Sequence, residues 1–301
     1  MRFRKTKNEF FFINKLSDVI QKEEEMANRD LFDISGRVAI VTGGLGQIGA
    51  EFVKELISRK AKVAVFARNV SEEKRNKVFG QEFVANPDLR FYSVDITKKE
   101  TINVALDDIE KVWDIPDILV NNAGLDTQPS APKEVSGPFE DFPEEVFREV
   151  VNINLVGTFL AVQAVGARMA KKGKGSIINV GSIYGMVSPI QDIYAYKKEK
   201  TGVPFIKPVA YSAAKSGVYN FTRYCATYWA KKGVRVNTLT PSGVFRADQD
   251  KEFQANYCAR IPIGRMANAD EYNGAMIFLA SDASVYMTGS NLIIDGGWTA
   301  V

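Results

Sequence analysis

The sequence predicts a doubly wound α/β fold, in which a parallel sheet of about seven strands carries helices on both faces. Strand-like and helix-like patterns alternate along most of the chain, as they do in consecutive βαβ units. A glycine-rich turn joins the first strand pattern to the first helix pattern. The 301 residues are 46% hydrophobic and 25% charged, so the chain can bury the core of one such domain.

The expected strands are short apolar runs, which suit a sheet covered on both faces. They cover residues 38–41, 62–66, 89–94, 118–121, 176–180, 234–239 and 292–294. The helical patterns between them cover residues 51–58, 72–85, 99–112, 144–170, 212–231 and 270–280. In the first of these helices, the apolar residues Phe52, Val53, Leu56 and Ile57 recur at the spacing of one helix face.

Residues 1 to about 30 differ in composition from the rest, so we interpret residues 31–301 as a single domain and the first 30 as an extension. The extension has mixed charge, no glycine and an aromatic cluster at Phe10, Phe11 and Phe12. We expect it to pack on the domain or on a neighbouring subunit. A targeting peptide is the less favoured alternative, because a long apolar core and a small-residue cleavage site are missing.

Composition argues against several functional classes. A net charge of +3 is too small to suggest nucleic-acid binding. Cys225 and Cys258 have no metal-binding spacing and the chain has no histidine, so a metal site is not expected. We see no apolar run of about 18 residues, so no membrane span is expected. A reducing cytoplasm is the expected location.

The glycine-rich turn has the spacing of a dinucleotide-binding loop. It reads Thr42-Gly43-Gly44-Leu45-Gly46-Gln47-Ile48-Gly49 and lies between a strand and a helix. Gly43 suits the tight turn, Gly46 a close approach of the backbone to a pyrophosphate, and Gly49 the packing of helix on strand. The N–H groups at the helix N-terminus then face the phosphates. A purely structural turn is the alternative.

Without histidine, proton transfer near neutral pH falls to a tyrosine, a lysine or a carboxylate. Tyr211 and Lys215 are four residues apart and share one face of a predicted helix. The Lys215 ammonium would favour the phenolate and pull the pKa of Tyr211 down from about 10. The same spacing occurs by chance on ordinary helices, where the tyrosine packs and the lysine is solvated.

Five motifs in order resemble those of the short-chain dehydrogenase/reductase family over residues of roughly 33 to 300. They are the glycine loop from Thr42 to Gly49, Asn121-Asn122-Ala123-Gly124, Ser182, the Tyr211 and Lys215 pair, and the stretch from Gly289 to Gly297. The resemblance implies a Rossmann fold and NAD(P)-dependent oxidation or reduction of an alcohol/ketone pair. The glycine spacing is that of the family's extended branch, whereas the chain length is that of its ordinary short branch.

The resemblance implies four catalytic residues. Asn154 would bend a long helix and hold a water in a proton relay, with Asn152 as the competing assignment. Ser182 would position the substrate carbonyl or alcohol, with Ser176 and Ser188 as alternatives. Tyr211 would transfer the proton, and Lys215 would lower its pKa and bind the nicotinamide ribose. Hydride would pass directly between nicotinamide C4 and the substrate carbon.

Residues at the end of the second expected strand indicate which of NAD and NADP the chain prefers. Ala67 stands where family members selective for NAD have an acidic residue, and the Arg68 guanidinium can hold the 2′-phosphate of NADP. NADP is therefore the expected cofactor, with NAD possible; Arg68 stacked on adenine or facing solvent is the alternative. The resemblance adds further cofactor contacts at Leu45, Gln47, Ile48, Asp95, Ile96, Asn122, Ala123, Gly124, Pro241, Gly243 and Val244.

The interval from Ser182 to Tyr211 is about twice as long as in most members of the family. The excess falls near residues 190–208 and contains four lysines, among them Lys197, Lys198 and Lys200. Both ends adjoin the active site, so we interpret it as a lid or rim with positive charge, suited to a polar or anionic substrate. An inert surface excursion is the alternative, because long loops cost little stability.

These observations together predict an oxidoreductase that interconverts a secondary alcohol and a ketone on a sugar, a sugar acid or a similar polar small molecule. Reduction of a 3-oxoacyl thioester is one alternative, and a non-catalytic cofactor-binding regulator or scaffold is another. The second long helix carries more aromatic residues than one buried face needs, and the resemblance implies that such helices pair across subunits, so a homo-oligomer, dimer or tetramer, is expected, with ordinary core packing as the alternative. They are Tyr219, Phe221, Tyr224, Tyr228 and Trp229.

Overall fold

The computed structural model describes residues 30–301 apart from residues 128 and 130, and the expected N-terminal extension lies almost wholly outside the described residues. One parallel sheet of seven strands runs through the molecule in the order β3-β2-β1-β4-β5-β6-β7. The strands are β1 (Val38–Thr42), β2 (Lys62–Ala67), β3 (Leu89–Ser93), β4 (Ile118–Asn121), β5 (Gly175–Val180), β6 (Val234–Pro241) and β7 (Asn291–Ile294). The predicted fold class is confirmed.

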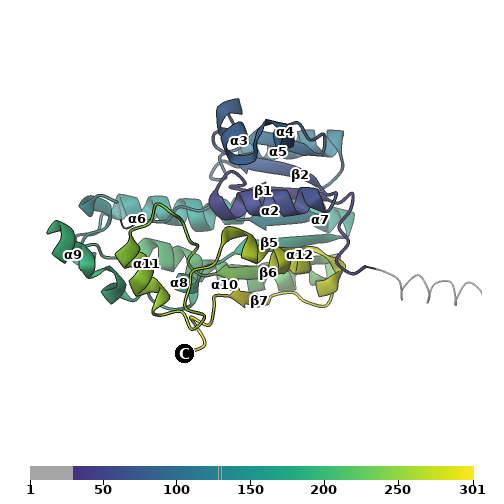
Figure 1. The fold of residues 1–301 in the computed structure, drawn as a ribbon. Coiled ribbons are helices and arrows are strands. Elements are labelled where there is room, and N and C mark those ends of the chain that lie inside the picture. Colours follow the sequence, from purple (N-terminus) through teal and green to yellow (C-terminus); the bar gives the residue numbers. More distant parts are fainter. Residues whose placement is uncertain (1–29, 128, 130) are drawn as a thin grey trace, which may run out of the picture.

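Helices cover both faces of this sheet (Figure 1). One apolar core joins the sheet to α5, α7 and α10, and a second core joins the opposite face to α2 and α12. The helices are α2 (Gln47–Ser58), α3 (Glu72–Phe79), α4 (Gln81–Val84), α5 (Lys99–Val112), α6 (Glu144–Val151), α7 (Gly157–Lys172), α8 (Ile183–Met186), α9 (Tyr196–Thr201), α10 (Val209–Trp229), α11 (Lys251–Cys258) and α12 (Asn273–Ala280).

Two of the expected helices are interrupted for identifiable reasons. The helix expected at 72–85 divides into α3 and α4 at Gly80, whose φ of 82° ends the first helix. The helix expected at 144–170 contains a π-helical turn, Asn152–Val156, between α6 and α7. The short helices α8, α9 and α11 were not predicted, because pieces of four to eight residues carry too little periodicity.

The continuous helical stretch Glu144–Lys172 is the one part of the described chain that is long and apolar enough to cross a membrane. The sequence analysis missed this run. Half of its most apolar window is buried inside the protein. Its C-terminal part, α7, packs on β4, β5 and β6, so most of its apolar residues belong to the core of the domain, whereas Phe159 is exposed.

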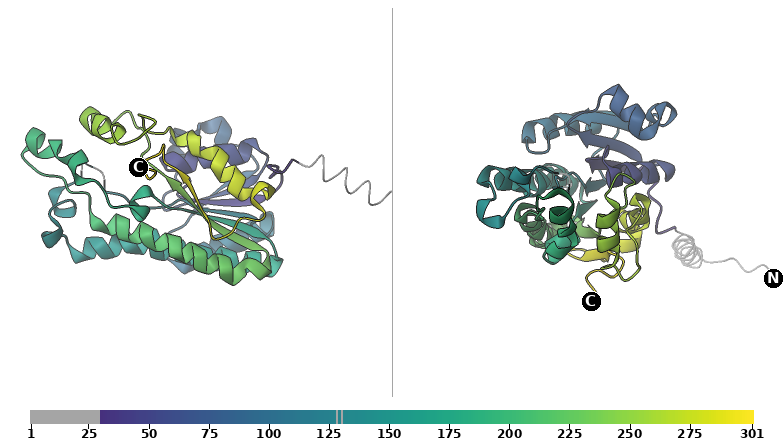
Figure 2. Two further views of the ribbon diagram at one scale, coloured as in Figure 1. Left: turned by 90° about the horizontal axis from the view of Figure 1, so that it is seen from below. Right: turned by 60° about the vertical axis from the view of Figure 1, so that its left-hand side comes forward.

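The carboxyl ends of β1 and β4 meet at the point where the strand order reverses, which is where ligands bind in open parallel sheets. Beyond the ends of β5 and β6, α9 and α11 lie together at the end of the molecule (Figures 1 and 2). Residues 190–208 form the 3-10 turn Gln191–Tyr194, the helix α9 and an extended return. A third apolar core, which includes Tyr194 and Phe253, joins this segment to α11.

Candidate active site

The glycine loop leaves β1 and packs tightly against its neighbours. Gly43 has a φ of 65°, and a Cβ there would lie 2.8 Å from the Ala123 Cα. A Cβ on Gly49 would lie 2.4 Å from the Gly43 carbonyl oxygen, so helix and loop touch through backbone alone. Gly46 precedes the first turn of α2. The two outer glycines therefore have the steric reasons that the motif predicted.

Asn122 fastens this loop to β4. Its side-chain amide donates to the carbonyl oxygens of Thr42 and Gly43, both at 3.3 Å. In return, the Thr42 hydroxyl accepts from the backbone N–H groups of Asn122 at 3.1 Å and Ala123 at 3.0 Å. The carboxyl ends of the two central strands are thereby locked together beside the loop.

A groove of about 960 Å³ runs from this loop across the ends of β2 and β4. Its volume is at the upper end of the usual range for ligand sites, which is about 300–1,000 Å³. Of the predicted cofactor contacts, those that line it are Gly43, Leu45, Gly46, Gln47, Ile48, Arg68, Asp95, Ile96, Asn122, Ala123 and Gly124. Gly49, the remaining glycine of the motif, lies beneath the loop. Within the groove, a hydrogen bond from Thr97 lowers the pKa of Asp95.

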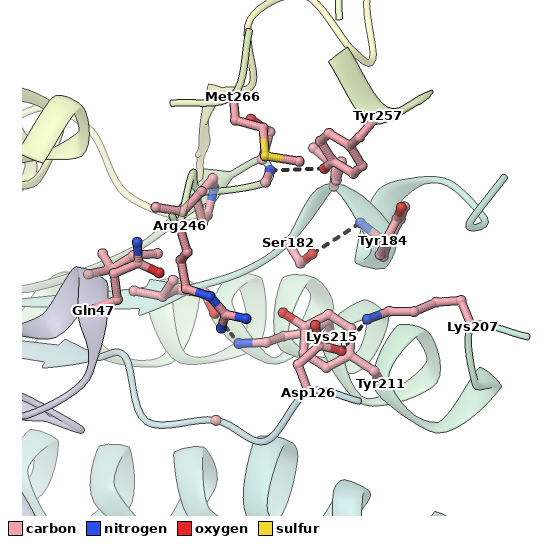
Figure 3. A pocket seen from close by; sticks show the side chains of 18 of the residues that line it. Gln47, Asp126, Ser182, Tyr184, Lys207, Tyr211, Lys215, Arg246, Tyr257 and Met266 are labelled. Atoms are coloured by element: carbon pink, nitrogen blue, oxygen red, sulfur yellow. Dashed lines mark hydrogen bonds and ion pairs between the residues drawn. The ribbon is translucent and has the colours of Figure 1, made fainter. Parts of the chain in front are cut away.

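A cavity of about 260 Å³ opens from the groove at the ends of β5 and β6, and it brings Ser182, Tyr211 and Lys215 together (Figure 3). Tyr211 and Lys215 lie on the first turns of α10, on one face as predicted. The Lys215 ammonium donates to the Val180 carbonyl oxygen at 2.7 Å and lies 5.8 Å from the centre of the Tyr211 ring. The predicted contacts Pro241, Gly243 and Val244 also line this cavity.

The expected lowering of the Tyr211 pKa is not found. Burial raises the pKa of the phenol well above its usual value, the carboxylate of Asp126 adds to the shift, and a hydrogen bond with Ser182 opposes it. Burial also lowers the pKa of Lys215 to about 8. Desolvation penalises the charged form of each group, and the Lys215 ammonium is hydrogen-bonded to a backbone carbonyl. The Tyr211 phenol is thus protonated at neutral pH.

The chain also resembles known proteins over most of its length. A family model described as enoyl-(acyl carrier protein) reductase matches residues 44–299. The chain is 32% identical to 2-dehydro-3-deoxy-D-gluconate 5-dehydrogenase of Bacillus subtilis, covering 89% of this chain and 97% of that protein. It is 33% identical to an NAD-dependent glycerol dehydrogenase of Listeria innocua, with 89% and 96% covered.

Two solved structures are similar as well. A short-chain dehydrogenase of Leptospira borgpetersenii with bound NAD+ has 35% identity and a TM-score of 0.75, covering 90% of this chain and 96% of that one. A gluconate 5-dehydrogenase of Burkholderia cenocepacia in complex with NADP and tartrate has 29% identity and a TM-score of 0.76, with 90% and 98% covered. The chain belongs to the short-chain dehydrogenase/reductase family. It is a nicotinamide-dependent oxidoreductase that acts on a small molecule.

In this short-chain dehydrogenase, Asn154 lies behind the cavity wall. It sits in the π-helical turn, where its side chain accepts from the Leu125 N–H and donates to the Leu125 carbonyl, both at 2.8 Å. It therefore ties the long helix to the loop after β4. Asn152, the competing residue, is exposed and lines the cofactor groove.

Of the three candidate serines, Ser182 is the one that lines the cavity. Its hydroxyl accepts from the Tyr184 N–H at 3.2 Å. The Tyr219 hydroxyl binds the Ser182 backbone at both its N–H and its carbonyl. Ser176 lies at the other end of β5 and donates to the Leu279 carbonyl, and Ser188 is exposed.

The sequence did not predict most of the side chains that line this cavity. They include Asp126, Tyr184, Tyr194, Lys207, Arg246, Gln249, Phe253, Tyr257 and Met266. They come from loops, from α8, from the segment 190–208 and from α11, and no motif joins them. Lys197, Lys198 and Lys200 do not line the cavity, and Lys200 pairs with Asp250 at 2.7 Å. Within the described residues, no group of three or more acidic or cysteine side chains could hold a metal ion.

Proposed function

We propose that this enzyme interconverts a secondary alcohol and a ketone on a small polyhydroxy compound, a sugar, a sugar acid or a similar polar molecule. The observation that carries the proposal is the cavity in which Ser182, Tyr211 and Lys215 meet at the end of the dinucleotide groove. Its lining is rich in hydroxyl, amide and charged groups. Relatives named for gluconate, glycerol and threitol support the same class of substrate.

The residues divide the reaction between them. When bound, the nicotinamide ring takes up or supplies a hydride at C4. In reduction, the Tyr211 phenol gives its proton to the substrate oxygen; in oxidation, the phenolate takes the hydroxyl proton. Ser182 donates a hydrogen bond to the same oxygen. Lys215, largely cationic at neutral pH, binds the ribose beside Tyr211 and stabilises the phenolate.

NADP(H) is the proposed cofactor, with NAD(H) also accepted. Arg68 and Lys74 both line the groove beyond the end of β2, and position 67 is alanine rather than an acid. Two cations at this place favour the 2′-phosphate of NADP through charge-assisted hydrogen bonds. The groove residues predicted from the sequence are proposed as the remaining cofactor contacts.

We further propose a single cytoplasmic domain, residues 31–301, that assembles as a homo-oligomer and binds neither nucleic acid nor membranes. Tyr224 and Tyr228 support the assembly, because their stacked rings are 65% and 59% exposed on α10. Tyr219 and Trp229, which the sequence placed in the same group, are buried. The exposed pair adjoins Phe159 and Phe221, so an apolar face covers α7 and α10.

A substrate screen tests the proposal. Purified protein is incubated with NADP+ or NAD+ and a panel of sugar acids, polyols and hydroxyacyl thioesters, and with the reduced cofactors and the matching ketones, while nicotinamide absorbance is followed. We expect turnover with polyhydroxy compounds. Tight cofactor binding without turnover of any class would instead indicate a regulator or scaffold, and turnover restricted to thioesters would reject the proposed substrate class.

A further inference from the structure

Lys207 is a buried lysine in the wall of the catalytic cavity. Its side chain is only 5% exposed, and its ammonium donates to an Asp126 carboxylate oxygen at 2.6 Å and to the Thr127 carbonyl at 2.8 Å. The same ammonium lies 5.5 Å from the centre of the Tyr211 ring and 5.9 Å from that of Tyr184 (Figure 3). Burying a lysine is costly, so its presence beside the proton donor calls for an explanation.

Lys207 lies at the substrate end of the cavity. The groove and the cavity share the residues Gln47, Ile48, Asn122, Gly124 and Asp126, which line their junction at the cofactor end, and Asp126 extends from this junction to Lys207. Lys207 belongs to the part that is not shared, together with Tyr184, Tyr194, Phe253 and Tyr257. Arg246 lies nearer the cofactor end, because the Gln47 side chain donates to the adjacent Phe245 carbonyl at 2.7 Å. Figure 3 shows Arg246 and Lys207 on opposite sides of Tyr211.

The charge of the cavity favours an anion. Its charged lining residues are Lys207, Lys215 and Arg246 against the single acid Asp126. Asp248, outside the lining, pairs with Arg246 at 3.1 Å, which leaves one more cation than acids. In a site that is walled by protein, such an excess of positive charge attracts a negatively charged ligand more strongly than it would in open water. Because Asp126 already takes part of the Lys207 charge, a carboxylate with one negative charge suits it better than a phosphate with nearly two.

The segment 190–208 holds Lys207 in a fixed place. The Lys207 N–H donates to the Gln191 side chain at 2.9 Å, and the Gln191 amide donates back to the Lys207 carbonyl at 3.1 Å. The neighbouring Ile206 N–H donates to the Ser136 carbonyl at 2.9 Å. The two ends of the segment are therefore cross-linked by hydrogen bonds beside the cavity. This segment acts as a rigid wall that presents one ammonium group to the site.

We propose that Lys207 binds the carboxylate of the substrate, so that the enzyme selects a small polyhydroxy acid over the neutral polyol of the same length. The inference rests on the proposed function, because Tyr211 must handle the reacting oxygen while Lys207 holds another part of the same molecule. The aromatic walls and the volume of about 260 Å³ limit the substrate to a short chain. Lys207 is thus a specificity-determining residue.

The test compares matched substrates in matched variants. Parent, Lys207→Met, Lys207→Arg and Lys200→Gln are assayed with an aldonic acid, the alditol of equal length and the corresponding sugar phosphate. Lys200→Gln is the control, because that lysine belongs to the same segment but lies outside the cavity. Parent should prefer the acid. Lys207→Met should raise KM for the acid by about 10- to 100-fold, the scale of one lost charge-assisted contact.

The control substrates separate specificity from folding. In Lys207→Met, KM for the alditol and cofactor affinity should change less than about threefold, and any change in kcat should be equal for acid and alditol, because Lys207 and Asp126 lie beside Tyr211. Lys207→Arg should recover part of the acid preference. Equal losses for acid and alditol, or a preference of the parent for the phosphate, would overturn the proposal. Turnover of alditols alone would also overturn it while leaving the proposed function intact. No turnover of any polyhydroxy compound would reject both.

Discussion

The groove beside the glycine loop and the far end of the cavity, which we propose bind the cofactor and the substrate, are built from different parts of the chain. The groove lies at the ends of β1, β2 and β4, where the glycine loop packs through its backbone and the Asn122 side chain binds the Gly43 carbonyl. The far end of the cavity is made of side chains from separate segments, among them Tyr184 of α8, Lys207 of the segment 190–208 and Tyr257 of α11. Backbone contacts demand particular residues at fixed spacing and are therefore visible in a sequence. Contacts between distant side chains have no such spacing.

The largest effect should come from Tyr211, where the two regions meet. Tyr211→Phe keeps the ring and removes the proton donor, so kcat should fall by at least about 100-fold, the scale of a lost acid/base group. Cofactor affinity, measured by fluorescence titration, should be unchanged. Tyr228→Phe, an exposed tyrosine on the same helix, is the control and should retain full activity. Near-parental turnover in Tyr211→Phe would show that another group moves the proton.

Substitution of Arg68 tests whether the groove recognises the charge of the cofactor's 2′-phosphate as well as the shape of the cofactor. Arg68→Ala should weaken NADP(H) by about 1.5–3 kcal/mol, the range for a charge-assisted hydrogen bond, and leave NAD(H) nearly unchanged. Dissociation constants for both cofactors measure the difference. Lys77→Ala, an exposed lysine of α3 outside the groove, should affect neither. Equal losses for both cofactors would place Arg68 away from the 2′-phosphate.

Gly49 tests the backbone construction of the groove. An alanine Cβ would meet the Gly43 oxygen at 2.4 Å and the Asn122 amide at 2.7 Å, so Gly49→Ala must displace the loop. We expect a loss of about 1–3 kcal/mol in unfolding free energy, typical of overpacking, and weaker binding of both cofactors. Gly274→Ala, in open space on α12, is the control. An unchanged loop in the alanine variant would contradict the steric account of this motif.

The pKa of Lys215 predicts a pH dependence of stability. Its folded-state pKa is lowered to about 8 from 10.5, so above pH 8 the unfolded chain binds more protons and folding becomes more favourable as pH rises. The parent should gain about 1–2 kcal/mol over Lys215→Met between pH 8 and 9.5, at about 1.4 kcal/mol per pKa unit. Urea denaturation at both pH values measures it. A difference that stays constant with pH would mean that Lys215 titrates normally.

The parts of the site that the sequence predicted depend on local spacing, and the parts that it missed come from contacts between separate segments. The strands, the glycine loop, and the placement of Tyr211 beside Lys215 could be predicted because each depends on local spacing. The prediction that the pKa of Tyr211 is lowered was wrong, because burial raises it and burial depends on the whole fold rather than on sequence spacing. The charge of the segment 190–208 was attributed to the cluster at Lys197, Lys198 and Lys200, whereas the lysine that reaches the cavity is Lys207. Two hydrogen bonds between the Gln191 side chain and the Lys207 backbone fix the position of this lysine.

Tyr219 explains how a long segment can stand between Ser182 and Tyr211 without separating them. Tyr211, Lys215 and Tyr219 recur every four residues along α10, and the Tyr219 hydroxyl holds the backbone of Ser182. The position of Ser182 relative to Tyr211 is thus fixed by contacts with α10 and not by the intervening chain. Evolution or design can therefore exchange that segment, and with it the substrate, while the chemical step keeps its geometry.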